Sequence, residues 1–458
     1  MHNKPKLKLI VETQVLLRNL TPDIVMEEAA VAGFIRHVER HFAAEIIWLG
    51  DTQNVFGYQT RPLSGQLPAI TKNTVVIGNL PALTEAARNS DALLVTVNHA
   101  LNDSAAFNLQ NTDDLVFLQK LLTPLNSGKI PNELLGGVLE EIQSDDPALL
   151  INPGIGEDTA AIDVAATEIL VLKADPITFA SNAISQYAVL VNANDIATAG
   201  AKPRWFMTTL LFPRYTTGLS IRHIILELSQ YCRKWDIVLA GGHTEITDAV
   251  TRPVVIGMMS GTVARDKLLN KKNIAAGDVM ILTKAVAVEG TALIAKEMAD
   301  ELLKGGMTPT EIGTCAHFLD MIGILPEADI AMQHQGVVAM HDVTEGGLAT
   351  AALEMAIAAG LGLSIDMDAV PVYPETQKIC AILNINPLGL ISSGCLLIAC
   401  KPQSAEELIA RLTQADIKAT AIATFTKEHP GTAVPLKAGQ SWPVFEVDEI
   451  ARIAQNYE

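Results

Sequence analysis

The feature that most constrains this chain is a series of four short segments in which glycine or another small residue stands beside a carboxylate. They are Gly154-Ile155-Gly156-Glu157-Asp158, Asn192-Ala193-Asn194-Asp195-Ile196, Gly241-Gly242-His243-Thr244-Glu245 and His341-Asp342-Val343-Thr344-Glu345-Gly346-Gly347. Glycine lets backbone N–H groups approach a phosphate closely, and carboxylates hold a hard cation such as Mg²⁺ that neutralises phosphate charge. One such segment is weak evidence, whereas four in one chain indicate a site for a phosphate-bearing ligand and its metal.

Length and composition predict several packed domains of the α/β kind. The 458 residues exceed the length at which one hydrophobic core stops growing, so two or three domains are expected. Hydrophobic residues make up 49% of the chain, charged residues 18% and aromatic residues only 5%. This mixture is typical of compact α/β packing and also fits a large oligomeric interface.

The net charge of -18 argues against nucleic acid and anionic membrane surfaces as partners, because no basic patch extends beyond Lys271-Lys272. The same negative charge would repel a nucleotide phosphate, and a bound divalent metal would neutralise that repulsion. The five scattered cysteines predict buried free thiols, and with no signal peptide or membrane-spanning run in the sequence we expect a cytoplasmic protein.

The organisation of the chain predicts a small α/β domain at residues 1–128, followed by domains at 129–272 and 273–458. Thr21-Pro22 starts an amphipathic helix of about six turns, and short apolar runs then indicate strands. The turn residues Asn126-Ser127-Gly128 mark the first boundary and a polar stretch at 270–277 marks the second. The later elements are expected as strands at 169–172, 254–259, 279–283, 337–340 and 396–400, and helices at 185–198 and 348–358.

Asp195 lies on a face of the predicted helix 185–198 that is otherwise apolar. A lone ionised carboxylate there would be costly, so it must be paired, hydrogen-bonded or bound to a metal, unless it merely ends the helix. Asp158 after its glycine turn and Asp175 after the strand 169–172 complete a plausible cage for a hard cation. Taken alone, Asp158 also fits a turn and Asp195 also fits a helix end.

The other two segments predict contacts with an anionic ligand. Strand 238–240 is expected to run into a loop at Gly241-Gly242, where no side chain blocks a phosphate, with Thr244 and Glu245 nearby. His243 fits either a proton-transfer residue or a histidine that only hydrogen-bonds the loop. His341 and Asp342 end a strand, and the backbone amides at Gly346-Gly347 suit an anion, although Thr344 would also serve as a helix cap. Lys173 and Lys284 are candidates for phosphate-binding cations or, equally, solvated surface residues, and Ser392-Ser393-Gly394 is a weaker signal of the same kind.

The four segments together resemble the AIR synthase-related (PurM-like) superfamily, a group of ATP-using enzymes, and the resemblance runs from Gly128 to about Ile453. It implies an AIR synthase-like two-domain core with a mixed-sheet N-terminal half and an α/β C-terminal half, preceded by the extra small domain. It also implies ATP and Mg²⁺ as ligands and a homodimer. By this resemblance Asp158, Asp175, Asp195 and Glu245 are the metal ligands, and His341 and Asp342 are the catalytic residues. The implied nucleotide contacts are Lys173, Asn194, Gly241, Gly242, Thr244, Thr344, Gly346 and Gly347.

The spelling His-Asp-Val-Thr-Glu-Gly-Gly is most similar to the HypE-like branch, hydrogenase maturation factors whose implied reaction is an ATP-dependent dehydration. In that branch the reacting group is carried on a C-terminal cysteine, but this chain has no cysteine after Cys400. We therefore expect the carrier step to be absent or supplied by another molecule.

Three readings of the function follow. The first is an ATP-dependent enzyme that phosphorylates an oxygen of a small molecule or protein-carried acceptor before elimination or nucleophile attack. The second is a small-molecule kinase of the thiamine-monophosphate kinase type, in which the phosphate stays on the product. The third is a non-catalytic nucleotide-binding assembly factor whose extra domain binds a partner.

Overall fold

The structure is a computed structural model of the whole chain. It describes residues 6–12, 28–49, 54–55, 58–61, 67–71, 74–90, 92–97, 107–125, 128–129, 132–148, 164–178 and 183–454. The predicted helix start at Thr21-Pro22, the turn residues Asn126-Ser127 and the segment from Gly154 to Asp158 lie outside these residues.

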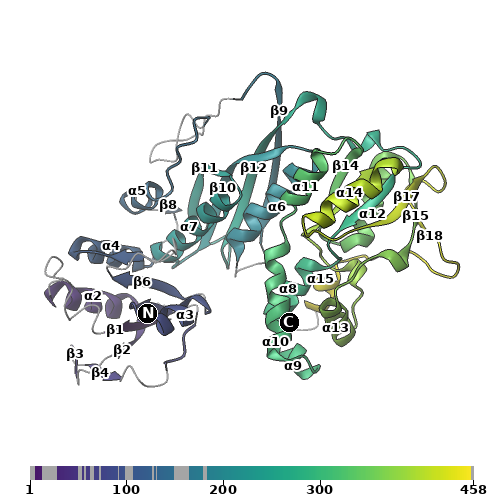
Figure 1. Ribbon diagram of the computed structural model, residues 1–458. Helices are drawn as coiled ribbons and strands as arrows, with labels where there is room; N and C mark the ends of the chain where they lie inside the picture. The colour runs from purple at the N-terminus through teal and green to yellow at the C-terminus, as the bar shows by residue number, and fades with distance from the viewer. Residues whose placement is uncertain are drawn as a thin grey trace. The chain divides into compact units, whose positions relative to one another are not determined.

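A seven-stranded, mostly parallel sheet forms the first part of the chain, in the order β3-β4-β2-β1-β5-β6-β7. Parallel strands are buried on both faces and therefore read as continuous apolar runs, as β5 does with all four residues buried. Helices α2, α3 and α4 pack with these strands or with each other (Figure 1), so this part of the chain has the predicted α/β character. The strands are β1 (Lys6–Glu12), β2 (Ala43–Leu49), β3 (Asn54–Val55), β4 (Tyr58–Arg61), β5 (Thr74–Ile77), β6 (Leu93–Val97) and β7 (Phe107–Leu109); the helices are α2 (Glu28–His41), α3 (Pro81–Arg88) and α4 (Thr112–Leu122).

The second sheet has five strands in the order β8-β11-β10-β12-β9. The predicted helix 185–198 is α6, and it is buried around most of its circumference because its sequence is apolar on nearly every side. The strands are β8 (Gly128–Lys129), β9 (Glu168–Ile177), β10 (Lys202–Pro213), β11 (Val238–Thr247) and β12 (Val254–Ala264); the helices are α5 (Asn132–Glu140), α6 (Ile184–Thr198) and α7 (Gly218–Lys234).

The third sheet has six strands in the order β14-β16-β13-β17-β15-β18 and is mainly antiparallel. Its strand β16 is buried at every residue, and helices α11, α12 and α14 pack against the sheet (Figure 1). The strands are β13 (Val279–Thr283), β14 (Val337–Val343), β15 (Gly362–Ile365), β16 (Cys395–Cys400), β17 (Ala419–Thr426) and β18 (Ala433–Pro435). The helices are α8 (Val288–Glu297), α9 (Ala299–Lys304), α10 (Pro309–Ala316), α11 (Leu325–Met332), α12 (Gly347–Ala359), α13 (Pro374–Leu383), α14 (Pro402–Gln414) and α15 (Glu449–Ala454). Short 3-10 turns are η1 (Arg265–Lys267), η2 (Lys271–Asn273), η3 (His317–Met321), η4 (Met367–Ala369) and η5 (Pro387–Gly389).

The chain divides into two compact units. The first unit is Met1–Asp163, Pro176–Val189 and Phe206–Gly257, and the second unit is Val164–Asp175, Leu190–Trp205 and Met258–Glu458. The domain boundaries inferred at residues 128 and 272 stay predictions.

Within the described residues the expected strands and helices are present, but β9 and β12 each continue five residues beyond their expected ends. Asp175 therefore lies within β9 and not after the strand, as the sequence predicted. All five cysteines are buried free thiols, which confirms that prediction. Within the described ranges, no helix combines the length and apolar character that crossing a membrane requires.

Candidate functional site

Charged side chains from β9 and α6 meet in the second unit. Lys173 Nζ lies 2.8 Å from Asp195 Oδ2 and 3.5 Å from Asp175 Oδ2. Burial lowers the pKa of Lys173, but its hydrogen bond to Asp195 and the charges of Asp195 and Asp175 outweigh burial, so the pKa is raised overall. The expectation that Asp195 must be paired on its apolar helix face is confirmed, and its partner is the Lys173 ammonium.

Asp342 adds a third carboxyl group to this cluster from the end of β14. It is only 3% exposed, and its Oδ2 atom is buried without a hydrogen-bond partner in the part of the chain that the structure describes. Burial raises the pKa of Asp342 well above its ordinary value, and the adjacent Asp195 carboxylate raises it further. A carboxyl group of this kind is suited to take up a proton near neutral pH.

The same residues fit a magnesium ion. The Lys173 ammonium already lies between Asp175 and Asp195, so this position attracts a cation. Magnesium in nucleotide sites typically takes one or two carboxylates and completes its shell with phosphate and water oxygens. No cluster of three or more His, Cys, Asp or Glu side chains within the described ranges is arranged to hold a metal alone. Asp175 and Asp195 are therefore suited to a partial ligand set.

His341 is held in place by the helix that follows its strand. Its Nε2 atom is 3.1 Å from Glu354 Oε2 on α12, and its Nδ1 atom is 3.9 Å from Asp342 Oδ1. The hydrogen bond from His341 lowers the pKa of Glu354 despite partial burial. His341 thus connects Asp342 to a carboxylate on α12 and has a fixed orientation.

The segment from Gly241 to Glu245 is part of strand β11, not the loop predicted from its glycines. Gly241 and Gly242 adopt φ angles of 145° and 154°, and these let the strand continue where other residues would be strained. A Cβ atom on Gly242 would lie 1.9 Å from the Thr208 carbonyl oxygen, so the glycine permits a close backbone approach to β10. The side chains of the exposed His243 and the partly buried Glu245 lie 3.6 Å apart. All these residues belong to the first unit.

Gly346 and Gly347 form the start of α12, and the amide of Gly346 binds a carboxylate of the chain itself. The Gly346 amide donates a 2.7 Å hydrogen bond to Asp448 Oδ2, where the sequence predicts an anionic ligand. A Cβ atom on Gly347 would lie 2.5 Å from the Leu388 carbonyl oxygen, which explains the second glycine by packing. Burial raises the pKa of Asp448, although the amides that it binds, including that of Gly346, lower it.

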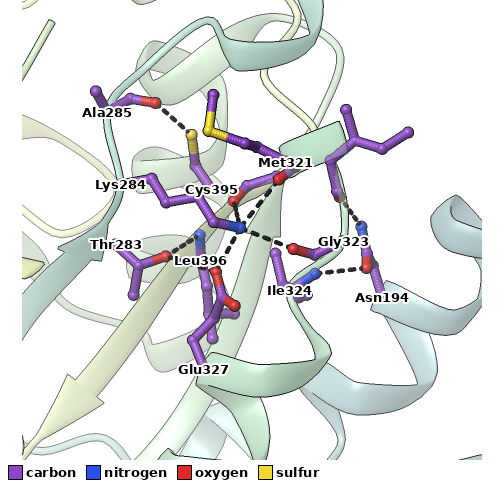
Figure 2. A network of polar contacts seen from close by, with 12 residues as sticks. Asn194, Thr283, Lys284, Ala285, Met321, Gly323, Ile324, Glu327, Cys395 and Leu396 are labelled. Carbon is purple, nitrogen blue, oxygen red and sulfur yellow. Dashed lines mark hydrogen bonds and ion pairs between the residues drawn. The ribbon is translucent and has the colours of Figure 1, made fainter. Parts of the chain in front are cut away.

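Lys284 is a structural cation and not a solvated one. Its Nζ atom donates to the carbonyl oxygens of Met321, Gly323 and Gly394 at 2.7–3.0 Å and lies 2.7 Å from Glu327 Oε1 (Figure 2). An ammonium group has three protons, so these partners leave none for a phosphate. Both alternatives for Lys284, a phosphate contact and a surface position, are wrong.

Asn194 fixes the loop to which Lys284 is bound. Its side chain is fully buried, donates to the Ile322 carbonyl at 2.9 Å and accepts from the Ile324 amide at 3.0 Å (Figure 2). Asn194 therefore links α6, at the residue before Asp195, to the loop 321–324, and carbonyl oxygens of this loop bind Lys284.

The turn at Ser392-Ser393-Gly394 binds a carboxylate of α8. The Ser393 amide donates to Glu289 Oε2 at 3.2 Å, and Glu289 Oε1 is buried without a hydrogen-bond partner among the described atoms. Burial raises the pKa of Glu289 from 4.5 to about 7, the bonds to Ser393 lower it, and Asp448 adds a smaller increase.

We expect Glu289→Gln to stabilise the protein above pH 7 by about 2 kcal/mol and to have little effect at low pH. The folded state holds this proton more tightly than the unfolded state, so the stability that the proton contributes is complete below about pH 4.5 and is lost as the pH rises to about 7. Urea midpoints at pH 5 and pH 8 measure the difference, with the exposed Glu446→Gln as control. A Glu289→Gln variant that is no more stable than wild type at pH 8 would contradict the raised pKa of Glu289.

Two family models match the chain over the region that holds these clusters. The model described as AIR synthase related protein, N-terminal domain, matches residues 156–263, and the corresponding C-terminal domain matches residues 275–434. The chain belongs to the AIR synthase-related family. Both catalytic candidates lie in the part that matches the C-terminal model, and Asp175 and Asp195 lie in the part that matches the N-terminal model.

The relatives of this AIR synthase-related protein include proteins of hydrogenase maturation. A hydrogenase expression/formation protein homologue of Methanocaldococcus jannaschii is 27% identical over 68% of this chain and 92% of its own length. The carbamoyl dehydratase HypE of Escherichia coli is 24% identical over 52% of this chain and 68% of its own length.

Solved structures share the fold. Escherichia coli HypE superposes with a TM-score of 0.59 at 19% identity and covers 70% of this chain and 98% of its own. A hydrogenase maturation protein HypE in complex with ATP gives a TM-score of 0.52 at 18% identity, covering 67% and 92%. The predicted AIR synthase-like fold and the family assignment are confirmed.

The individual site roles stay predictions, and the structure brings only some of these residues together. Lys173, Asp175, Asp195, His341 and Asp342 gather in the second unit, whereas Asp158 lies outside the described residues. Sequence reasoning missed three charged residues around this AIR synthase-related site: Lys271, Glu354 and Asp448. Glu354 had a usable signal, because it is an isolated carboxylate in an otherwise apolar helix, but Asp448 had none.

Proposed function

We propose that this protein is an ATP-dependent enzyme that phosphorylates an oxygen of an amide-type group, on a small molecule or a carrier, and so activates it for elimination or nucleophile attack. The observation that carries the proposal is the buried Asp342 carboxyl, with one unpartnered oxygen, beside the Lys173–Asp195 pair. Supporting evidence comes from a relative named carbamoyl dehydratase and from the HypE structure that contains ATP.

In this proposal Asp342 accepts the proton that the acceptor loses as its oxygen attacks the terminal phosphorus. Its raised pKa suits that role, and the His341–Glu354 hydrogen bond orients the neighbouring imidazole toward the same place. Bound Mg²⁺ would supply charge neutralisation and alignment of the phosphates. We assign Asp175 and Asp195 to the metal, together with Asp158 and Glu245.

The remaining assignments concern the nucleotide and the assembly. We assign the nucleotide contacts to a set of lysine, amide, hydroxyl and glycine positions: Lys173, Asn194, Gly241, Gly242, Thr244, Thr344, Gly346 and Gly347. The protein acts as a homodimer with domains at 1–128, 129–272 and 273–458, and the first of these recognises the acceptor or its carrier.

Calorimetric titration with ATP tests the binding half of this proposal. We expect saturable binding in the presence of Mg²⁺ that is lost in EDTA, because phosphate needs a cation to enter the carboxylate cluster. Asp195→Asn should weaken binding about tenfold or more, equivalent to about 1.4 kcal/mol. Equal binding with and without metal would refute the carboxylate assignment.

Turnover with primary carboxamides labelled with ¹⁸O in the carbonyl tests the chemical half. Transfer of the label into inorganic phosphate is the expected result, because the activated oxygen leaves with the phosphate. Label retained on a phosphorylated product would identify a kinase instead. Tight Mg-ATP binding without turnover of any amide would favour a nucleotide-binding assembly factor.

A further inference from the structure

A cleft of about 370 Å³ opens in the second unit next to the carboxylate cluster. Its walls include Thr198, Leu269, Lys271, Lys272, Ala339 and Met340. These residues come from the last turn of α6, the segment around η2, and strand β14 just before His341 and Asp342. The volume falls at the small end of the range of about 300–1,000 Å³ that is typical of sites for small molecules.

The cleft lies near Asp342 along the same strand. Met340 and Asp342 are two residues apart on β14, and side chains at that spacing point to the same side of a sheet. Thr198 donates to the Asp195 carbonyl oxygen at 2.8 Å, so the α6 wall of the cleft ends one turn after the metal-binding candidate. A ligand in the cleft would therefore reach the carboxyl groups proposed for the chemistry.

Lys271 places a partly buried positive charge in the wall of this cleft. It is half-buried, and no described residue forms a hydrogen bond or an ion pair with its ammonium group. Burial lowers the pKa of Lys271, while the charges of Asp342, Asp195 and Glu354 oppose that effect, so the ammonium is near the carboxylate cluster. These charges act at a distance, so the partly desolvated ammonium still lacks a direct hydrogen bond, and an anion that enters the cleft would supply one.

The other walls define the rest of the ligand. Leu269, Ala339 and Met340 present apolar surface, and Ala358 lines the cleft from an exposed position on α12. In a chain with a net charge of -18, a half-buried lysine, Lys271, at a small cleft favours a negative group, whereas the charge of the exposed Lys272 is screened by solvent. The chemistry indicated is a carboxylate or phosphate attached to a short apolar body.

We propose that this cleft, called here the Lys271 cleft, binds an anionic group of the acceptor molecule, with Lys271 as its counter-ion. The assignment of the anion to the acceptor rests on the proposed function. Asp342 is then within reach of the part of the acceptor that is phosphorylated, and the Lys271 contact fixes the orientation of the acceptor. A phosphate of the nucleotide has the same chemistry and is the competing source of the anion.

Ligand-observed NMR with hexanoate and butyl phosphate tests the cleft directly, with neutral hexanamide as the uncharged analogue. We expect wild-type protein with Mg²⁺ to bind both anions in the millimolar range and hexanamide at least tenfold more weakly. Lys271→Met should weaken both anions at least tenfold, whereas Lys271→Arg keeps the charge and binding within about threefold. The exposed neighbour Lys272→Met is the matched control and should change binding by about twofold or less.

Two further measurements separate this inference from the proposed function. Ala358→Phe fills the cleft from the helix surface and should abolish anion binding while Mg-ATP affinity, measured by calorimetry, stays at the wild-type value. Equal loss of Mg-ATP and anion binding in Lys271→Met would assign the cation to the nucleotide and overturn the proposal. Mg-ATP binding by wild type without any anion binding would refute the Lys271 cleft and leave the proposed function standing. Anion binding by wild type without any Mg-ATP binding would refute the proposed function and, with it, the assignment of the anion to the acceptor, while the anion site itself would stand.

Discussion

Asp342→Asn should lower amide-dependent ATP turnover by about 100-fold or more, equivalent to about 2.7 kcal/mol of activation free energy. Asparagine keeps the shape of the side chain but cannot accept a proton. Because burial and Asp195 raise the pKa of Asp342, its charged form is unfavourable in the folded protein. The neutral variant should therefore melt at the wild-type temperature or above.

The combination of lost turnover and retained stability distinguishes chemistry from structure. Asp329→Asn is the matched control, since burial also raises the pKa of Asp329 and this residue of α11 is not among those assigned to the site. It should retain turnover within about twofold. Wild-type turnover in Asp342→Asn would exclude Asp342 as the base, and a large fall in melting temperature would make it a structural residue.

Lys284→Met should destabilise the second unit by about 3–5 kcal/mol. The substitution removes the cationic partner of Glu327, whose side chain is 1% exposed, and leaves three carbonyl oxygens without this donor (Figure 2). In a unit of this size the melting temperature should fall by about 10 °C. Differential scanning calorimetry and urea denaturation measure the two quantities.

Two controls test the explanation. Lys304→Met removes a mostly exposed partner of Glu301 and should change stability by less than about 1 kcal/mol. The double variant Lys284→Met, Glu327→Leu should recover part of the loss, because it no longer buries an uncompensated carboxylate. A single variant as stable as wild type, or a double variant less stable than the single one, would contradict a structural role for this pair.

The loop that Lys284 holds also carries the bonds to Asn194, so the destabilised variant should bind Mg-ATP more weakly even at temperatures where it stays folded. This follows because residues 321–324 fix the position of α6 next to Asp195. The predicted nucleotide contact of Asn194 stays a prediction, but its buried amide already has one donor and one acceptor bond to this loop.

Much of the local structure was predictable from the order of residues alone. Strands such as Val279–Thr283 and the helix from Ile184 to Thr198 follow from apolar runs and helical spacing, which depend on neighbours in the sequence. The same reasoning predicted that Asp195 needs a partner, since a charge on an apolar helix face is costly whatever the fold. It also identified the AIR synthase-related family from four short segments.

The tertiary structure decided which charges meet and what each glycine permits. Lys173 became the partner of Asp195, Lys284 was enclosed by carbonyl oxygens, and the Gly346 amide was bound by Asp448, about a hundred residues later in the chain. Gly242 lies within a strand, and Thr208 of the neighbouring strand approaches its backbone closely. This contact cannot be predicted from the residues next to Gly242 in the sequence. Local patterns determine elements because their interactions are short in sequence, whereas pairing, burial and pKa depend on residues that only folding brings together.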